Sequence, residues 1–275
     1  SYIFSAAALL AFVLLLGSGE KRLSRLVPVG LLTFGITITN FIQTCVVFLL
    51  VRRDLKEIFK YVLIVLALAA ALAFVQHTLY PSSEPFYDIG NLTGESVYRY
   101  DLFEVPASVA VSRANVIFRN IALFSVVAPR PLVFLEELGC TFPCFNTIRY
   151  YRGAYQYASY IGFGSLLART WFVLLLAAGG LFAWKLLKSP REASLQAALA
   201  LNLLFNFVLH MNYGDDPLLY SPNWTYALVL FFGMSFEKFA DRKWFQTALL
   251  VFLTVLMVNN LEFLRKVLEA VLPFK

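Results

Sequence analysis

The chain of 275 residues is 60% hydrophobic and 15% charged, with a net charge of +6 and a mean hydropathy of +0.70. Soluble domains carry about 25% charged and about 45–50% apolar residues, so these values exclude an ordinary soluble protein. Several apolar runs approach or exceed the roughly 20 residues that a helix needs to cross the hydrocarbon core. The basic residues cluster between these runs, so the charge indicates membrane topology, and we expect no nucleic-acid partner.

Residues 1–79 are predicted to form N-terminal membrane helices, with one apolar run over 2–16 and another over 61–77. No basic stretch precedes the first run, so a signal peptide is not indicated, and we expect residues to be missing ahead of Ser1. Residues 27–51 are apolar but contain Pro28, Gly30, Gly35, four Thr and Asn40, with basic residues at both ends. They form either one span or a broken hairpin, and only the hairpin puts both basic ends on one side.

Residues 80–160 form a long polar segment with six prolines. Within it, residues 105–127 mix apolar side chains with arginines, which predicts one or two interfacial amphipathic helices. Cys140 and Cys144 are close enough in sequence to form a local disulfide in an oxidising compartment.

Residues 161–275 contain the C-terminal membrane helices, which we predict over 161–187, 194–209, 220–236 and 245–258, followed by a short amphipathic tail. The fold class is therefore all-α, a polytopic transmembrane helical bundle with a long extracytoplasmic loop carrying amphipathic helices. The positive-inside rule assigns the short basic loops to the cytoplasm and the 80–160 segment to the outside. This predicts an integral protein of the cytoplasmic (inner) membrane or of an ER-type membrane.

The loop between two of these helices holds the main candidate site. Asp215 and Asp216 could bind Mg²⁺ or Mn²⁺, act as a general base or bind sugar hydroxyls. The alternative is a solvated helix boundary that favours the dipole of the next helix. His210 is either a proton carrier or a hydrogen-bonded helix end. Tyr220, with Trp224 and Tyr226, is typical of an interfacial aromatic belt, and a sugar-stacking platform is the alternative.

Arginines in the long segment are candidates for a phosphate clamp, because guanidinium groups match phosphate oxygens, although attraction to anionic headgroups would equally explain them. They are Arg99, Arg113, Arg119 and Arg130. Asn91 and Asn223 begin tripeptides of the glycosylation acceptor pattern, the second of them close to the membrane.

Three features resemble the C-terminal membrane part of the GT-C-type integral-membrane glycosyltransferases, which depend on polyprenyl-phosphate sugars. The stretch Val27–Arg53, VPVGLLTFGITITNFIQTCVVFLLVRR, is similar to their paired short helices with a basic end. Short basic loops alternate with long extracytoplasmic ones. The loop Tyr213–Trp224 is similar to the loop that borders their lipid-sugar site.

The resemblance implies sugar transfer from a polyprenyl-phosphate donor to an extracytoplasmic acceptor. Arg99 or Arg113 would bind the donor phosphate, and its sugar would lie near Asp215, Asp216 and Tyr220. The family's catalytic acidic residue lies in an early extracytoplasmic loop, so we expect it among residues ahead of Ser1.

Two other functions stay open. One is a structural or accessory subunit of a larger membrane complex, which fits the 27 phenylalanines. The other is a transporter, with Thr37, Thr39, Asn40 and Gln43 on a broken helix at the bilayer midplane.

Overall fold

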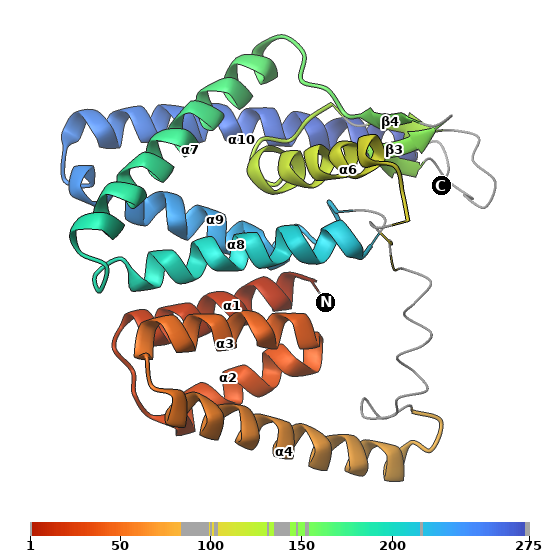
Figure 1. Ribbon diagram of the computed structural model, residues 1–275. Helices are drawn as coiled ribbons and strands as arrows, with labels where there is room; N and C mark the ends of the chain where they lie inside the picture. The colour runs from red at the N-terminus through yellow and green to blue at the C-terminus, as the bar shows by residue number, and fades with distance from the viewer. Residues whose placement is uncertain are drawn as a thin grey trace. The chain divides into compact units, whose positions relative to one another are not determined.

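A computed structural model describes residues 2–83, 99, 101, 104–130, 132–134, 144–146, 148–151, 154–214 and 217–272. It confirms the predicted helical bundle class (Figure 1). Four helices are long and apolar enough to cross a membrane: α4 (Leu55–Leu79), α7 (Phe163–Lys188), α8 (Ser194–Asn212) and α10 (Lys243–Val271). Their length and composition indicate an integral membrane protein. The chain divides into two compact units.

Unit 1 comprises Ser1–Asp101, Lys185–Asp215 and Pro222–Leu230. It contains α1 (Tyr2–Gly17), α2 (Leu23–Ile36), α3 (Ile38–Arg52), α4, α8 and most of α9 (Pro222–Ser235). The helices α1, α2 and α3 pack against one another, α2 also packs on α4, and α3 packs on α8. With 14 residues, α9 is shorter than the span expected over 220–236, and Tyr220 lies in the turn that precedes it.

The core of unit 1 is organised around Tyr61 of α4, which is fully buried. Its ring stacks on Phe48 at 5.1 Å, and its hydroxyl lies 2.9 Å from Thr44 Oγ1. Gly30 of α2 faces this ring so closely that a Cβ there would overlap the tyrosine. The glycine is therefore required for the close approach of α2 to α4.

Two helices occupy the interrupted region 27–51. The break lies at Thr37, whose backbone is extended (φ −156°, ψ 145°) and whose hydroxyl accepts a hydrogen bond from the Asn40 amide at 3.2 Å. Arg52 Nη2 donates to the Lys21 carbonyl at 3.4 Å, so the end of α3 lies beside the residues that precede α2. Arg53 Nη2 donates to the Pro190 carbonyl at 3.1 Å. Three basic loops of unit 1 thus meet at one end.

Unit 2 comprises Leu102–Trp184, Asp216–Ser221 and Phe231–Lys275. One or two amphipathic helices were expected over 105–127, and this region contains α6 (Ala107–Arg119), which continues as the π-helical turn η2 (Asn120–Phe124). The short strands of this unit were not predicted from the sequence. The strand β1 (Leu132–Phe134) pairs antiparallel with β2 (Cys144–Asn146), and β3 (Ile148–Tyr151) with β4 (Ala154–Tyr157). Strands of three or four residues are too short to establish an alternating pattern. The Cys140–Cys144 disulfide prediction falls outside the described residues.

The helices of unit 2 pack through aromatic rings. Trp171 of α7 lies 4.9 Å from Phe232, and its Nε1 donates to the Ala122 carbonyl at 2.7 Å. After η3 (Glu237–Phe239), α10 continues without a break through the expected span and into the expected tail, as far as Val271. Between these two parts, Asn259 and Asn260 hydrogen-bond backbone groups of residues 126–128 at 2.9–3.0 Å. These two asparagines attach α10 to the end of the amphipathic segment.

Candidate functional site

The loop after α8 lies at the end of unit 1 away from the basic loops. The helix α8 begins four residues after Pro190, which lies at the basic end. Its 19 residues span about 28 Å, so the loop that follows lies at the other end. The chain leaves it in an extended conformation at Tyr213 (φ −148°, ψ 139°). Gly214 then has φ 85°, a conformation that favours glycine, so the chain turns directly before the acidic pair. Asp215 and Asp216 themselves lie outside the described residues.

His210 closes the interior side of this loop. It is 2% exposed, and its Nδ1 lies 3.2 Å from the Tyr213 carbonyl. Its ring meets the fully buried Trp224 ring edge to face, at 5.2 Å and 71°. The imidazole is thus held by backbone on one side and an indole on the other, as expected of a histidine that stabilises a helix end.

Arg99 belongs to the long segment but joins the same loop. Its backbone forms an antiparallel bridge with Tyr213. Its side chain is 70% exposed and pairs with Asp101 at 3.5 Å. Two of the predicted site residues therefore contact Tyr213, Arg99 through its backbone and His210 through its ring nitrogen Nδ1.

The remaining candidates belong to unit 2. Tyr220 is half-buried in the turn before α9. Arg113 of α6 is only 5% exposed, so it offers little surface to a lipid phosphate. Arg119 lies over the rings of Phe124 and Tyr157, at 5.5 and 5.0 Å, which is cation–π packing. Arg130 is exposed and hydrogen-bonds the Ser159 carbonyl through its backbone amide at 2.8 Å.

Below the loop, a continuous chain of buried hydrogen bonds connects α8, α9, α3 and α1. Each side chain donates to the next one, over 2.6–3.3 Å. In order of donation the residues are Asn202, Tyr226, Gln43, Asn40, Ser5 and Asn223. We call these six residues the polar chain. Buried polar side chains commonly join membrane helices, and here they attach the start of α9 to α1 and α3.

The sequence pattern pointed to Asn40 and Gln43 as polar residues within a membrane helix, whereas it suggested other roles for Tyr226 and Asn223 and gave none for Ser5 and Asn202. A signal was present in α8, where Asn202, Asn206 and His210 recur every four residues in an otherwise apolar helix. This spacing puts them on one face, which predicts a buried polar contact.

The aromatic belt prediction is wrong for two of its three residues. Trp224 is fully buried and Tyr226 is 8% exposed, because both face the neighbouring helices of unit 1. A belt residue would face the lipid interface, and a sugar-stacking residue would be open to the ligand. Asn223 is also buried, and its side chain accepts a hydrogen bond from Ser5 Oγ at 2.6 Å. Its acceptor tripeptide is therefore inaccessible to glycosylation in this fold.

Among the described residues, no group of three His, Cys, Asp or Glu side chains could hold a metal ion. The predicted Mg²⁺ or Mn²⁺ site at Asp215 and Asp216 falls outside them. The sequence matches no family model, no curated protein and no solved structure. A functional argument for this chain therefore depends on its own residues.

Proposed function

We propose that the chain is the membrane part of a glycosyltransferase that transfers a sugar from a polyprenyl-phosphate donor to an acceptor outside the cytoplasm. The observation that carries the proposal is the antiparallel bridge between Arg99 and Tyr213. It supports a site in which an exposed guanidinium from the long segment stands beside the loop that leads into two carboxylates.

In this site Arg99 binds the donor phosphate, because its forked N–H groups match phosphate oxygens. Asp215 and Asp216 bind the sugar hydroxyls, or a divalent cation that contacts the phosphate. His210 and the polar chain hold the two helices that carry the loop.

A cavity of about 410 Å³ supports a donor with an apolar chain. It lies in unit 1 beside the break between α2 and α3, and α4 forms its other wall. Most of its lining is apolar, including Leu31, Phe34 and Leu72, whereas Thr37 and Gln76 are polar. Cavities of 300–1,000 Å³ with a few polar groups are typical of small-molecule sites.

The test is transfer by the full-length protein in lipid vesicles, with short polyprenyl-phosphate hexoses as donors. Arg99→Gln is expected to raise KM for the donor about tenfold, through loss of a charge-assisted hydrogen bond. The double variant Asp215→Asn with Asp216→Asn is expected to lower kcat at least a hundredfold, because both carboxylates that hold the sugar are lost. Arg169→Gln and Asp241→Asn remove exposed charges elsewhere and serve as controls. Unchanged transfer in both site variants would remove this loop from the mechanism.

An accessory subunit of a membrane complex is the second candidate. It is favoured by α10, whose most apolar stretch has none of its residues buried inside the described fold. Such a helix can pack against a partner protein as well as against lipid. Stable co-purification with partner chains, without transfer activity, would favour this candidate over the enzyme.

The transporter receives less support. Asn40 and Gln43 are fully buried and hydrogen-bonded to side chains of neighbouring helices, as packing residues are. A transport site needs such groups open to a substrate.

A further inference from the structure

Two cavities adjoin in unit 2, between residues 128–130, the start of α7 and the second half of α10. One has a volume of about 180 Å³ and the other about 380 Å³. They share five lining residues, which are Ile161, Gly164, Asn259, Glu262 and Lys266. We call the smaller one the polar cavity and the larger one the apolar cavity, because of their remaining walls.

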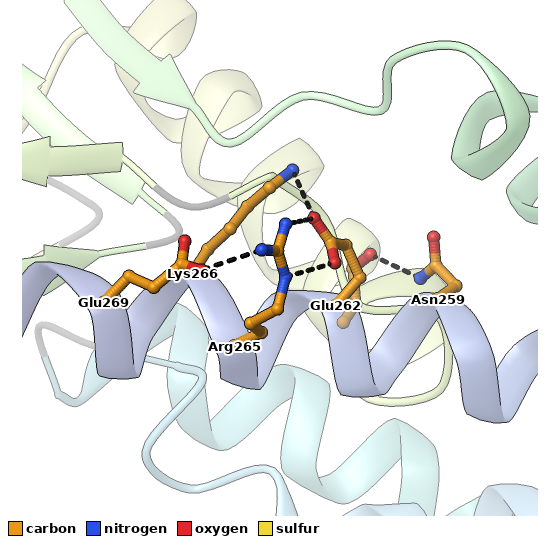
Figure 2. Close-up of polar contacts among 6 residues, drawn as sticks. Asn259, Glu262, Arg265, Lys266 and Glu269 are labelled. Carbon is orange, nitrogen blue, oxygen red and sulfur yellow. Dashed lines mark hydrogen bonds and ion pairs between the residues drawn. The ribbon is translucent and has the colours of Figure 1, made fainter.

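The polar cavity carries an excess of positive charge. Arg130 and Lys266 line it together with a single carboxylate, that of Glu262. Figure 2 shows that Arg265, three residues after Glu262 on α10, holds this carboxylate in two hydrogen bonds of 2.7 and 2.8 Å and also pairs with Glu269. Lys266 also forms an ion pair with Glu262, at 3.6 Å. Two cations and one carboxylate line the cavity, so one positive charge is in excess and can attract an anion.

The apolar cavity continues along the same side of α10. Its own lining is Phe163, Thr254, Val255 and Val258, of which Phe163 is 61% and Val258 63% exposed. The change from apolar to charged residues along α10 occurs at Asn259 and Asn260, one turn before Glu262. In a membrane-spanning helix such a change marks the depth of the headgroup region.

We propose that these cavities form one binding site for a lipid with a phosphate headgroup. The phosphate lies between Arg130 and Lys266 in the polar cavity, and the hydrocarbon chain lies against Phe163, Val255 and Val258 in the apolar one. Asn259 borders both parts and already bonds the Ala128 carbonyl at 3.0 Å, which fixes the wall between them. This inference is independent of the proposed function, because binding is measured without transfer.

Native mass spectrometry of the delipidated full-length protein tests the proposal, with phosphatidylglycerol and farnesyl phosphate as probes. Each cation is expected to contribute about tenfold to the affinity, so Arg130→Gln combined with Lys266→Gln weakens retention about a hundredfold. The matched control is Lys243→Gln, at the opposite end of α10, where an exposed cation lies away from both cavities. It is expected to change retention less than twofold.

A second variant tests the chain-binding part. Val258→Phe fills the apolar cavity from an exposed position and leaves every charge in place, so it is expected to weaken lipid retention at least tenfold. Stronger retention of phosphatidylglycerol would identify a bilayer lipid as the ligand, and stronger retention of farnesyl phosphate a polyprenyl phosphate. Equal retention by the double variant and the Lys243→Gln control would overturn the proposal. The proposal would also be overturned if inorganic phosphate displaced bound phosphatidylglycerol at the same concentration at which farnesyl phosphate displaces it.

Discussion

The polar chain of unit 1 and the ion pairs of α10 in unit 2 are polar contacts of opposite kinds. In unit 1 the polar chain is buried, with Asn40, Gln43 and Asn202 fully covered. In unit 2 the ion pairs of α10 are exposed, with the Arg265 side chain at 60% and Glu269 at 55%. A buried polar atom that loses its partner stays desolvated, whereas an exposed ion pair is replaced by water. Loss of a partner in the polar chain should therefore cost more stability than loss of an ion pair on α10.

The largest effect is expected at the closest helix contact of unit 1. Gly30→Ala places a Cβ where the Tyr61 ring lies, so the ring must move and lose its contact with Thr44. We expect a destabilisation of about 3 kcal/mol, measured as the free energy of unfolding in mixed micelles. Gly35→Ala in the same helix meets no atom within 4 Å and is the control. Equal stability of the two variants would mean that α2 does not pack against Tyr61 as described.

A smaller loss is expected when the polar chain is cut in its middle. Gln43→Leu removes the acceptor of the Tyr226 hydroxyl and the donor to Asn40, and leaves both partners buried. We expect a loss of about 2 kcal/mol in the free energy of unfolding, because desolvated polar groups lose their partners.

Gln246 provides the matched control, since it is an exposed glutamine of α10 that hydrogen-bonds the Ala240 carbonyl. Gln246→Leu is expected to change stability by less than about 0.5 kcal/mol. If both substitutions cost the same, the proposed difference between buried and exposed polar contacts does not hold.

The smallest effect is expected at the ion pairs of α10. Arg265→Gln breaks the contacts with Glu262 and Glu269, which are drawn in Figure 2. Exposed pairs of this kind contribute about 0.2–1 kcal/mol and are screened by salt. The difference in unfolding free energy from the unchanged protein should therefore shrink when the salt concentration is raised. A salt-independent loss above about 2 kcal/mol would show that these pairs are buried against a partner.

Composition and hydropathy were sufficient to predict the helical membrane class, because runs of apolar residues have few other solutions in a bilayer. The interruption of residues 27–51 was visible in Pro28, Gly30 and Gly35, although the position of the break was not. The break lies at Thr37, where a hydroxyl caps the next helix through Asn40.

What the sequence did not reveal depends on contacts between distant residues. Trp224 and Tyr226 have the composition of an interfacial belt, and only the packing of α9 against α8 and α3 shows that they are buried. Arg99 meets Tyr213 across 114 positions of sequence, a pairing that no local pattern predicts. Such contacts are set by tertiary structure, which overrides local preference.

The polar chain also bears on the movement of protons. A row of hydroxyl groups can relay a proton by exchanging donor and acceptor roles, as water does. Here the amides of Gln43 and Asn40 stand between the Tyr226 and Ser5 hydroxyls, and a carboxamide at neutral pH neither gains nor gives up a proton. All five bonds donate in the same direction, so reversal requires all four carboxamides of the polar chain to rotate. The polar chain can therefore join four helices without conducting protons between them.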